Sequence, residues 1–249
     1  MLITLRDTKD WPAHEDLERL DALDAPWAIG SEAMSAVRER LALLGSKTPL
    51  TIVEFGGGVS TAALARAFPR AHILSIDHDP RFLEATRLRV AGTRVEVSLR
   101  PLTWQDHGEA PYLSYEAGAF PEMVDAVLVD GPPHWTRGGR EATLYQVFDR
   151  LKVGGLVILD DHRRRRERRI VEHWLEVYRG SLELVEVLEV GHHLAVLRKT
   201  DALAPSWEGR RRFDAKVQAG LQPLTATLRR VALGLRGCGA ARSLAAVSS

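Results

Sequence analysis

The stretch Thr51-Ile-Val-Glu-Phe-Gly-Gly-Gly-Val-Ser-Thr61 decides the fold, because an apolar, β-branched run leads directly into three glycines. A short apolar run that ends at glycine is typical of a buried strand, and glycines permit a tight turn with close approach of another backbone. The next residues have the character of a helix, whose first N–H groups can face a polar or anionic ligand. The stretch therefore predicts a strand, a turn and a helix around a ligand site, with Gly56, Gly57, Gly58 and Ser60 as candidate ligand contacts.

Outward from this stretch, short apolar runs alternate with longer segments of helical period, a pattern typical of parallel sheets with crossover helices. The predicted strands are residues 51–55, 72–77, 94–98, 125–130 and 155–160. The predicted helices are residues 31–44, 60–68, 80–90, 140–151 and 163–178. Residues 182–190 and 194–198 are both strand-like, and the three residues between them are too few for a crossover helix, so they should pair antiparallel. The sequence thus predicts an α/β fold with a doubly wound, mostly parallel seven-stranded sheet that ends in a C-terminal antiparallel hairpin.

Charge and patterning divide the chain into three parts. Residues 201–249 hold eight basic and three acidic side chains, a charge of +5, so residues 1–200 carry −4 of the total of +1. We expect residues 1–30 to be an N-terminal segment that acts as a substrate lid or packing arm, and residues 31–200 to be the compact domain. We expect residues 201–249 to be a basic tail with a short amphipathic helix at about 223–236. The N-terminal segment or this helix could join two copies in a homodimer.

Composition excludes several classes of protein. With 45% hydrophobic and 27% charged residues, the chain is neither intrinsically disordered nor collagen-like. Its one cysteine, Cys238, cannot form an internal disulfide, and charged residues within 6–10 interrupt the apolar stretch that a signal peptide needs. No apolar run approaches the roughly 18 residues of a transmembrane segment, and a net charge of +1 gives no overall bias toward nucleic acid. We therefore expect a cytoplasmic protein.

The second predicted strand ends in Asp77, followed by His78. In an open α/β sheet, a carboxylate at this position can accept hydrogen bonds from both hydroxyls of a ribose. As a dinucleotide fingerprint the turn is incomplete, because Gly56 and Gly58 fit the first two positions while Thr61 occupies the third. The missing glycine and the antiparallel end of the sheet disfavour a nicotinamide enzyme. The alternative that the glycine turn is only a tight connection between strand and helix, in another kind of α/β protein, stays open.

Residues 54–58, Glu-Phe-Gly-Gly-Gly, resemble the first motif of class I S-adenosylmethionine-dependent methyltransferases, an acid-x-Gly-x-Gly pattern, and Asp77 matches their ribose-binding acid. The resemblance covers about residues 31–200 and implies the Rossmann-like methyltransferase fold. It also implies that the glycine turn lies under the amino acid part of the cofactor, and that the region 102–106, with Trp104, flanks the adenine. The cofactor-binding residues that it implies are Glu54, Gly56, Gly57, Gly58, Ser60, Asp77, His78 and Trp104.

Three acids follow the fourth and fifth predicted strands: Asp130, and the adjacent pair Asp160 and Asp161. Ligands bind at the carboxyl ends of the strands in such sheets, so these side chains should converge on one crevice. Converging carboxylates repel each other unless a cation or a basic substrate group lies between them, and Mg²⁺ is the simplest such cation. The alternative to a cation site is that Asp160 caps the following helix and Asp130 lines the transfer pocket.

This arrangement is similar to that of metal-dependent O-methyltransferases of the catechol and macrolide-sugar types, which implies Asp130, Asp160 and Asp161 as metal ligands. In that setting a metal would lower the pKa of a substrate hydroxyl and fix its orientation. The sugar-modifying branch has a second acid two residues after the first, whereas here the third residue is Pro132. That leaves His134, Asp161 or His162 as candidate bases, or a metal-bound alkoxide without one.

Two further segments flank these acids. Residues 130–140 are rich in turn formers and form a plausible substrate lid that contains His134. Residues 163–169 read Arg-Arg-Arg-Arg-Glu-Arg-Arg, which is either an electrostatic site for an acidic substrate, a carrier protein or RNA, or a solvated helix face.

Taken together, the motifs predict a methyltransferase that moves a methyl group from S-adenosylmethionine to a hydroxyl of a small molecule, such as a sugar or secondary metabolite. The candidate catalytic residues are Asp130, His134 and Asp161. Two alternatives stay open: an RNA or protein methyltransferase that docks through the arginine run, and a binding module that keeps the cofactor site but transfers nothing.

Overall fold

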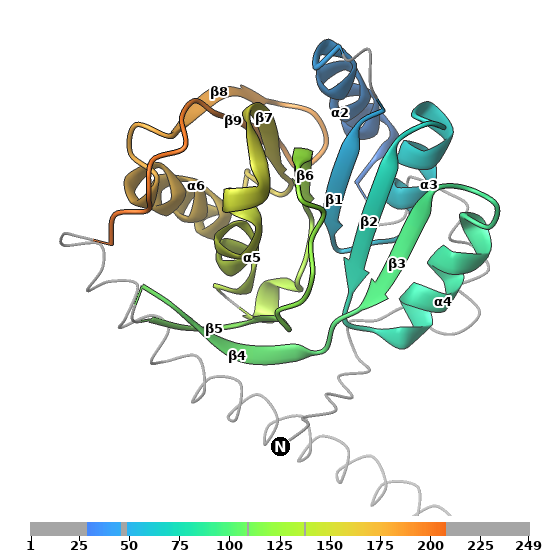
Figure 1. Cartoon of the computed structure of the whole chain (residues 1–249), viewed down its shortest axis with the longest axis horizontal. Helices are drawn as coiled ribbons and strands as arrows, with labels where there is room; N and C mark the ends of the chain where they lie inside the picture. Colours follow the sequence, from blue (N-terminus) through green and yellow to red (C-terminus); the bar gives the residue numbers. More distant parts are fainter. Residues whose placement is uncertain (1–28, 46–48, 109, 137, 208–249) are drawn as a thin grey trace, which may run out of the picture.

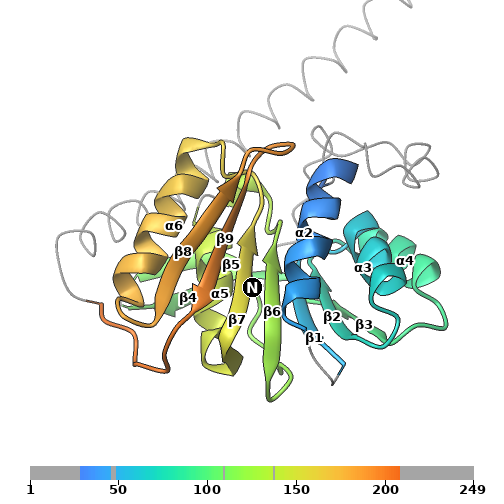
Figure 2. The same cartoon turned by 90° about the horizontal axis from the view of Figure 1, so that it is seen from above.

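The computed structural model describes residues 29–45, 49–108, 110–136 and 138–207. Within these ranges, seven strands form one sheet in the order β3-β2-β1-β6-β7-β9-β8, with helices on both faces (Figure 1, Figure 2). The strands of this sheet are β1 (Thr51–Phe55), β2 (His72–Asp77), β3 (Val95–Leu99), β6 (Val124–Val129), β7 (Leu151–Leu159), β8 (Leu182–Leu188) and β9 (Leu194–Lys199). Strand β9 is inserted between β7 and β8 and runs antiparallel to both. The predicted fold class, with its C-terminal hairpin, is therefore confirmed.

The helices divide between the two faces of the sheet. They are α2 (Ser31–Leu43), α3 (Val59–Ala67), α4 (Pro80–Arg89), α5 (Gly139–Val147) and α6 (Arg165–Val177), with short 3-10 turns η1 (His134–Thr136) and η2 (Phe148–Arg150). Helix α2 packs on α3, and α3 on α4, along one face, while α5 and α6 contact each other on the opposite face. Each helix begins or ends next to a strand, as βαβ connections require.

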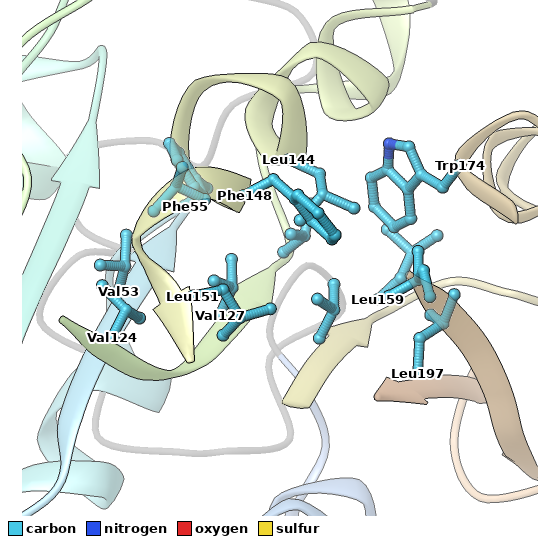
Figure 3. Close-up of a cluster of buried hydrophobic side chains, with 14 of the residues drawn as sticks. Val53, Phe55, Val124, Val127, Leu144, Phe148, Leu151, Leu159, Trp174 and Leu197 are labelled. Carbon is cyan, nitrogen blue, oxygen red and sulfur yellow. The ribbon is translucent and has the colours of Figure 1, made fainter. Parts of the chain in front are cut away.

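The central strands are buried on both faces, which explains their nearly continuous apolar sequences. In β1, Ile52 packs in the cluster beneath α2 and α3, whereas Val53 and Phe55 join the opposite cluster with Leu144 of α5 and Trp174 of α6. Figure 3 shows this second cluster, with Trp174 closing it on the side of α6. The indole Nε1 of Trp174 donates a hydrogen bond of 2.8 Å to the backbone oxygen of Glu141, so its one polar atom has a partner in the core.

A second, two-stranded sheet was not expected from the sequence. Strands β4 (Leu102–His107) and β5 (Ala110–Tyr115) pair antiparallel between β3 and β6 in the chain. Figure 1 shows this hairpin beyond the ends toward which β2 and β3 point. The region 102–106, which the resemblance places beside the adenine, therefore belongs to a strand of this small sheet.

Three predictions fall on residues outside the described ranges: the lid or packing arm within 1–28, the amphipathic helix at 223–236, and a homodimer through either of them. The chain still packs on the domain after β9, because the backbone N–H of Ser206 donates to the oxygen of Val177 at 2.7 Å. The ring of Trp207 then packs edge-on against Tyr145, with 4.9 Å between ring centroids. Among the described residues, no helix has both the length and the apolar character needed to cross a membrane.

Candidate active site

The turn after β1 is held against the end of β6 by two glycines. Gly56 has a φ of +91°, and a Cβ placed there would lie 2.7 Å from the backbone nitrogen of Gly131. The N–H groups of Asp130 and Gly131 both donate to the oxygen of Phe55, at 2.9 and 2.8 Å. Only glycine combines this backbone conformation with such close contact, so the sequence reason for Gly56 is steric.

The other turn residues are also fixed by internal hydrogen bonds. The N–H groups of Gly56 and Gly57 donate to the oxygen of Ile76, at 2.9 and 3.3 Å, and the N–H of Gly58 donates to Oγ1 of Thr61 at 2.9 Å. The amides of the three glycines are thus committed to the protein. A ligand at this turn would therefore pack closely against the backbone of the glycines. It would not depend on hydrogen bonds from their N–H groups.

Glu54 lies beneath the turn and is fully buried. Its carboxylate accepts hydrogen bonds from Oγ of Ser60, at 2.6 Å, and from Oγ1 of Thr61. Burial raises the pKa of Glu54 to about 7, although the hydroxyls of Ser60 and Thr61 act to lower it. The predicted cofactor residues Glu54 and Ser60 are thus brought together, with Glu54 holding the start of α3 from the protein side.

This buried acid makes stability depend on pH in a defined direction. The pKa of Glu54 is about 7 in the folded protein, against 4.5 for an ordinary glutamate, so the folded protein binds the proton more tightly than the unfolded chain does. Protonated Glu54 contributes fully to the free energy of unfolding below the unfolded-state pKa. This contribution is lost as the pH rises through 7, which lowers the free energy of unfolding by about 3 kcal/mol. Melting curves from pH 5 to 8 should therefore show a loss of stability in the wild type.

The Glu54→Gln variant provides the matched control, because its amide resembles the protonated acid and does not titrate. We expect its stability relative to the wild type to improve steadily from pH 5 to pH 8. Parallel curves for the two proteins over this range would contradict the assignment of the shift to Glu54.

Asp77 lies at the carboxyl end of β2, as predicted. Its Oδ1 accepts a hydrogen bond of 2.8 Å from the backbone N–H of Asp79 and lies 3.2 Å from Nδ1 of His78. No donor among the described residues reaches its other oxygen, Oδ2. Asp77 is thus oriented by its neighbour while one carboxylate oxygen remains available to a ligand hydroxyl.

Tyr115, which the sequence reasoning missed, comes from β5 of the hairpin and lies over the same turn. Its ring stacks on Phe55 with 5.8 Å between centroids, and a Cβ at Gly131 would lie 2.1 Å from its hydroxyl. Burial raises the pKa of Tyr115 well above its ordinary value, and the charge of Asp77 adds to the effect. Trp104, the predicted adenine neighbour, is on the adjacent strand β4 with 39% of its surface exposed.

Asp130, Asp160 and Asp161 converge as the sequence predicted, with one carboxylate oxygen of each within 4.8 Å of the others. Asp160 and Asp161 are buried, whereas the side chain of Asp130 is 15% exposed. Burial raises the pKa of Asp130 and of Asp160, and in each case a neighbouring carboxylate adds to the effect. The cluster therefore concentrates negative charge at the ends of β6 and β7.

A cation from the chain itself lies in this cluster. Arg140, in the first turn of α5, is buried, with Nη1 2.9 Å from Oδ2 of Asp161 and Nη2 3.3 Å from Oδ1 of Asp130. Octahedral magnesium needs near-ideal geometry with oxygen ligands at about 2.0–2.1 Å, and the guanidinium already occupies Oδ1 of Asp130 and Oδ2 of Asp161 beside any such ion. The donor set therefore does not fit a divalent ion held by all three acids while Arg140 keeps these contacts.

The turn between β8 and β9 also reaches this edge of the sheet. The backbone oxygens of His192 and His193 accept from the N–H groups of Arg163 and His162, at 3.0 and 2.9 Å. Nδ1 of His192 lies 3.5 Å from Oδ1 of Asp161. The acid pair is thus braced from the C-terminal hairpin as well as from α5.

The two candidate histidine bases differ in exposure. His134 is exposed in η1, and its backbone oxygen accepts a hydrogen bond of 2.9 Å from Arg166. His162 is buried, and burial, together with the positive charge of Arg168, lowers its pKa. A lowered pKa favours the neutral form of His162, and the catalytic role of His134 stays a prediction.

The arginine run, residues 163–169, follows the acid pair directly and extends into the first turns of α6. Its exposed members are Arg163, Arg164, Arg165, Arg166, Arg168 and Arg169. Glu167 is buried instead, on the same face of the helix as Ile170 and Trp174. Nη1 of Arg164 pairs with Asp161, so one of these arginines reaches the acid cluster. The run therefore forms a positively charged surface next to the site.

Comparisons with known proteins agree on the fold. No model of a protein family and no curated protein sequence matches this chain. Among solved structures, it is similar to the O-methyltransferase TomG from Streptomyces achromogenes, involved in tomaymycin synthesis and solved with SAM. The identity is 18% and the TM-score 0.53, over 76% of this chain and 92% of that one.

An O-methyltransferase from Bacillus cereus, solved with SAH, is similar at 15% identity and a TM-score of 0.53, over 76% of this chain and 92% of that one. A methyltransferase from Geobacter sulfurreducens gives 16% identity and a TM-score of 0.50, over 75% of this chain and 85% of that one. At these identities the likeness concerns the fold. The chain has the fold of class I methyltransferases.

Proposed function

We propose that this protein is an S-adenosylmethionine-dependent methyltransferase that acts on a hydroxyl of a small molecule, such as a sugar or secondary metabolite. The observation that carries the proposal is the joint placement of the glycine turn, Asp77 and Asp130 at one edge of the sheet. In open α/β sheets this edge is where ligands bind. The similarity in fold to solved O-methyltransferases supports the same conclusion.

The residues present fit this cofactor. Oδ2 of Asp77 can accept a ribose hydroxyl, and Gly58, where a Cβ would meet no atom within 4 Å, leaves space beside the turn for the amino acid part. When bound, S-adenosylmethionine supplies a methyl group on a positively charged sulfur. Glu54 would keep α3 in place through Ser60, and Tyr115 would close the site from the hairpin and exclude water.

Asp130 is our proposed proton acceptor. Its side chain is more exposed than that of Asp161, at 15% against 6%, so a substrate hydroxyl can reach it. The hydroxyl proton would pass to the carboxylate of Asp130 as the oxygen bonds to the methyl carbon and the carbon–sulfur bond breaks. The products are a methyl ether and S-adenosylhomocysteine. Asp161, held by Arg140 and Arg164, would position the site rather than take the proton.

The test combines cofactor binding with turnover. Calorimetry should show that the wild type binds S-adenosylmethionine, and a panel of hydroxyl-bearing acceptors should yield S-adenosylhomocysteine. With an accepted substrate, Asp130→Asn should lower kcat by about 10²–10⁴-fold, the usual contribution of a general base, and leave cofactor binding within a few fold.

Asp149→Asn, at an exposed acid in η2 before β7 begins, is the matched control and should keep full activity. An unchanged kcat in Asp130→Asn would remove Asp130 from this role. Absence of cofactor binding in the folded wild type would overturn the proposed function itself.

A second candidate acceptor is RNA or protein, favoured by the exposed arginines at the start of α6. Binding that depends on phosphate contacts falls steeply as salt rises, whereas binding of a neutral small molecule does not. Salt dependence of KM therefore separates the two acceptor classes.

Turnover with any acceptor excludes a non-catalytic module. On the basis of its single cysteine, we place the activity in the cytoplasm.

A further inference from the structure

We infer that the guanidinium of Arg140 is the resident cation of the acid cluster, defined as Asp130, Asp160 and Asp161, and that it takes the place a divalent ion would need. The claim about ion binding can be tested without turnover. Its consequence, methyl transfer that requires no metal, rests on the proposed function.

Hydrogen bonds from its three nitrogens fix the position of the Arg140 guanidinium. Nε donates to the oxygen of Pro132 at 3.1 Å, Nη1 to Oδ2 of Asp161 at 2.9 Å, and Nη2 to the oxygen of Asp130 at 2.7 Å and to its Oδ1 at 3.3 Å. Nη1 also lies 3.5 Å from the oxygen of Asp160. All three nitrogens of the guanidinium are therefore engaged by the segments that carry the three acids.

The charge and the burial of Arg140 also indicate that it serves as the cation of the acid cluster. A buried guanidinium is strongly disfavoured unless carboxylates surround it, and buried carboxylates are disfavoured without a cation. Burial alone would lower the pKa of Arg140, but the charges of Asp130, Asp161, Glu167 and Asp160 together raise it. The arginine therefore stays charged, and each partner offsets part of the cost of burying the other.

This arrangement competes directly with a metal. The guanidinium holds Oδ1 of Asp130 and Oδ2 of Asp161, so an ion bound by all three acids would lie next to it, placing two cations side by side in a largely buried site. Such repulsion is strong at low dielectric. Arg140 would have to leave for the ion to bind, yet it belongs to α5, which packs in the core through Leu144 and Val147.

The function of Arg140 is thus to position the acids. It joins the end of β6 to the segment after β7, and so fixes the two carboxylates relative to the glycine turn. Arg140 is only 6% exposed, and its side-chain contacts in the proposed site are with the acids and the backbone that carries them. Its role is that of a positioning residue within the proposed site.

The test measures Mn²⁺ binding to the full chain by electron paramagnetic resonance, in which only free Mn²⁺ gives the sharp signal. The wild type should leave this signal unchanged at millimolar Mn²⁺, as should Arg140→Lys, which keeps a cation in the cluster. Arg140→Met has similar length without charge and should bind one Mn²⁺ at least about tenfold more tightly than the wild type. The double variant Arg140→Met/Asp160→Asn should lose that binding.

Two results would overturn the inference. One is a wild type that binds one Mn²⁺ and loses it on Asp160→Asn. The other is a folded Arg140→Met variant that binds none. If Arg140→Met does not fold, the wild type and Arg140→Lys decide the matter. Failure of S-adenosylmethionine to bind would contradict the proposed function and leave the Mn²⁺ result intact, so the two failures are distinguishable.

Discussion

Gly56→Ala should abolish detectable binding of S-adenosylmethionine and lower the free energy of unfolding by about 2–6 kcal/mol. The backbone at Gly56 has a φ of +91°, which a side chain rarely adopts, and the new Cβ would lie 2.7 Å from a backbone nitrogen of Gly131. The left-handed conformation costs about 1–3 kcal/mol, and overpacking against backbone adds about 1–3 kcal/mol. Relief of the overlap would push the ends of β1 and β6 apart. Denaturant unfolding and calorimetry measure the two effects.

Gly92→Ala is the matched control, since Gly92 has a φ of +77° but open space around its Cβ position. It should show only the conformational cost and bind the cofactor like the wild type. Equal destabilisation in the two variants would show that the contact with Gly131 contributes nothing, and normal cofactor binding by Gly56→Ala would remove the turn from the site.

Asp77→Ala should weaken binding of S-adenosylmethionine by about 10–100-fold. A hydrogen bond to a charged group contributes about 1.5–3 kcal/mol, and the carboxylate at the end of β2 is the group positioned to accept ribose hydroxyls. The fold should survive, because the side chain of Asp77 has one backbone donor, Asp79, and lies at the end of its strand. Calorimetry gives the dissociation constant directly.

Asp149→Ala removes a carboxylate at an exposed position and should bind the cofactor as the wild type does. If Asp77→Ala kept wild-type affinity, the ligand of the glycine turn would have to be one without a ribose at this place. Calorimetry with adenosine alone would then show whether the nucleoside part binds at all.

The main sheet could be predicted from the sequence because its central strands are buried on both faces and have nearly continuous apolar sequences. Residues 51–55 and 72–77 match β1 and β2 at both ends, since each apolar run ends in glycine or in acid. The antiparallel pairing of β8 with β9 followed from a gap too short for a helix, whereas the insertion of β9 between β7 and β8 was not predicted. The convergence of Asp130 with Asp160 and Asp161 followed from strand ends alone, because parallel strands place them at one edge.

The hairpin β4–β5 could not be seen so easily because β4 is only half-buried and has no clear apolar alternation. One signal was present: two residues separate the strands, and the first is Gly108, with a φ of +54°, which is typical of a tight hairpin. The place of Tyr115 over the glycine turn depends on this hairpin, so missing the hairpin meant missing Tyr115.

The position of Arg140 has a different cause. Its partner Asp161 is 21 residues away, and the contact depends on how α5 enters between two strand ends. A pattern of residue types identifies which side chains reach the edge of a sheet, but the pairing among them is a tertiary property. Sequence reasoning therefore recognised that the acids need a cation and did not identify the arginine that supplies it.

The insertion of β9 between β7 and β8 also has a consequence for the order in which the nascent chain can build this site. The acid pair is braced by backbone oxygens of His192 and His193, which are synthesised about thirty residues after Asp160. The glycine turn and Asp77 can find their places once β1, β2 and β6 exist. The hydrogen bonds that brace the acid pair from the C-terminal hairpin can therefore form only after residues 192 and 193 have left the ribosome.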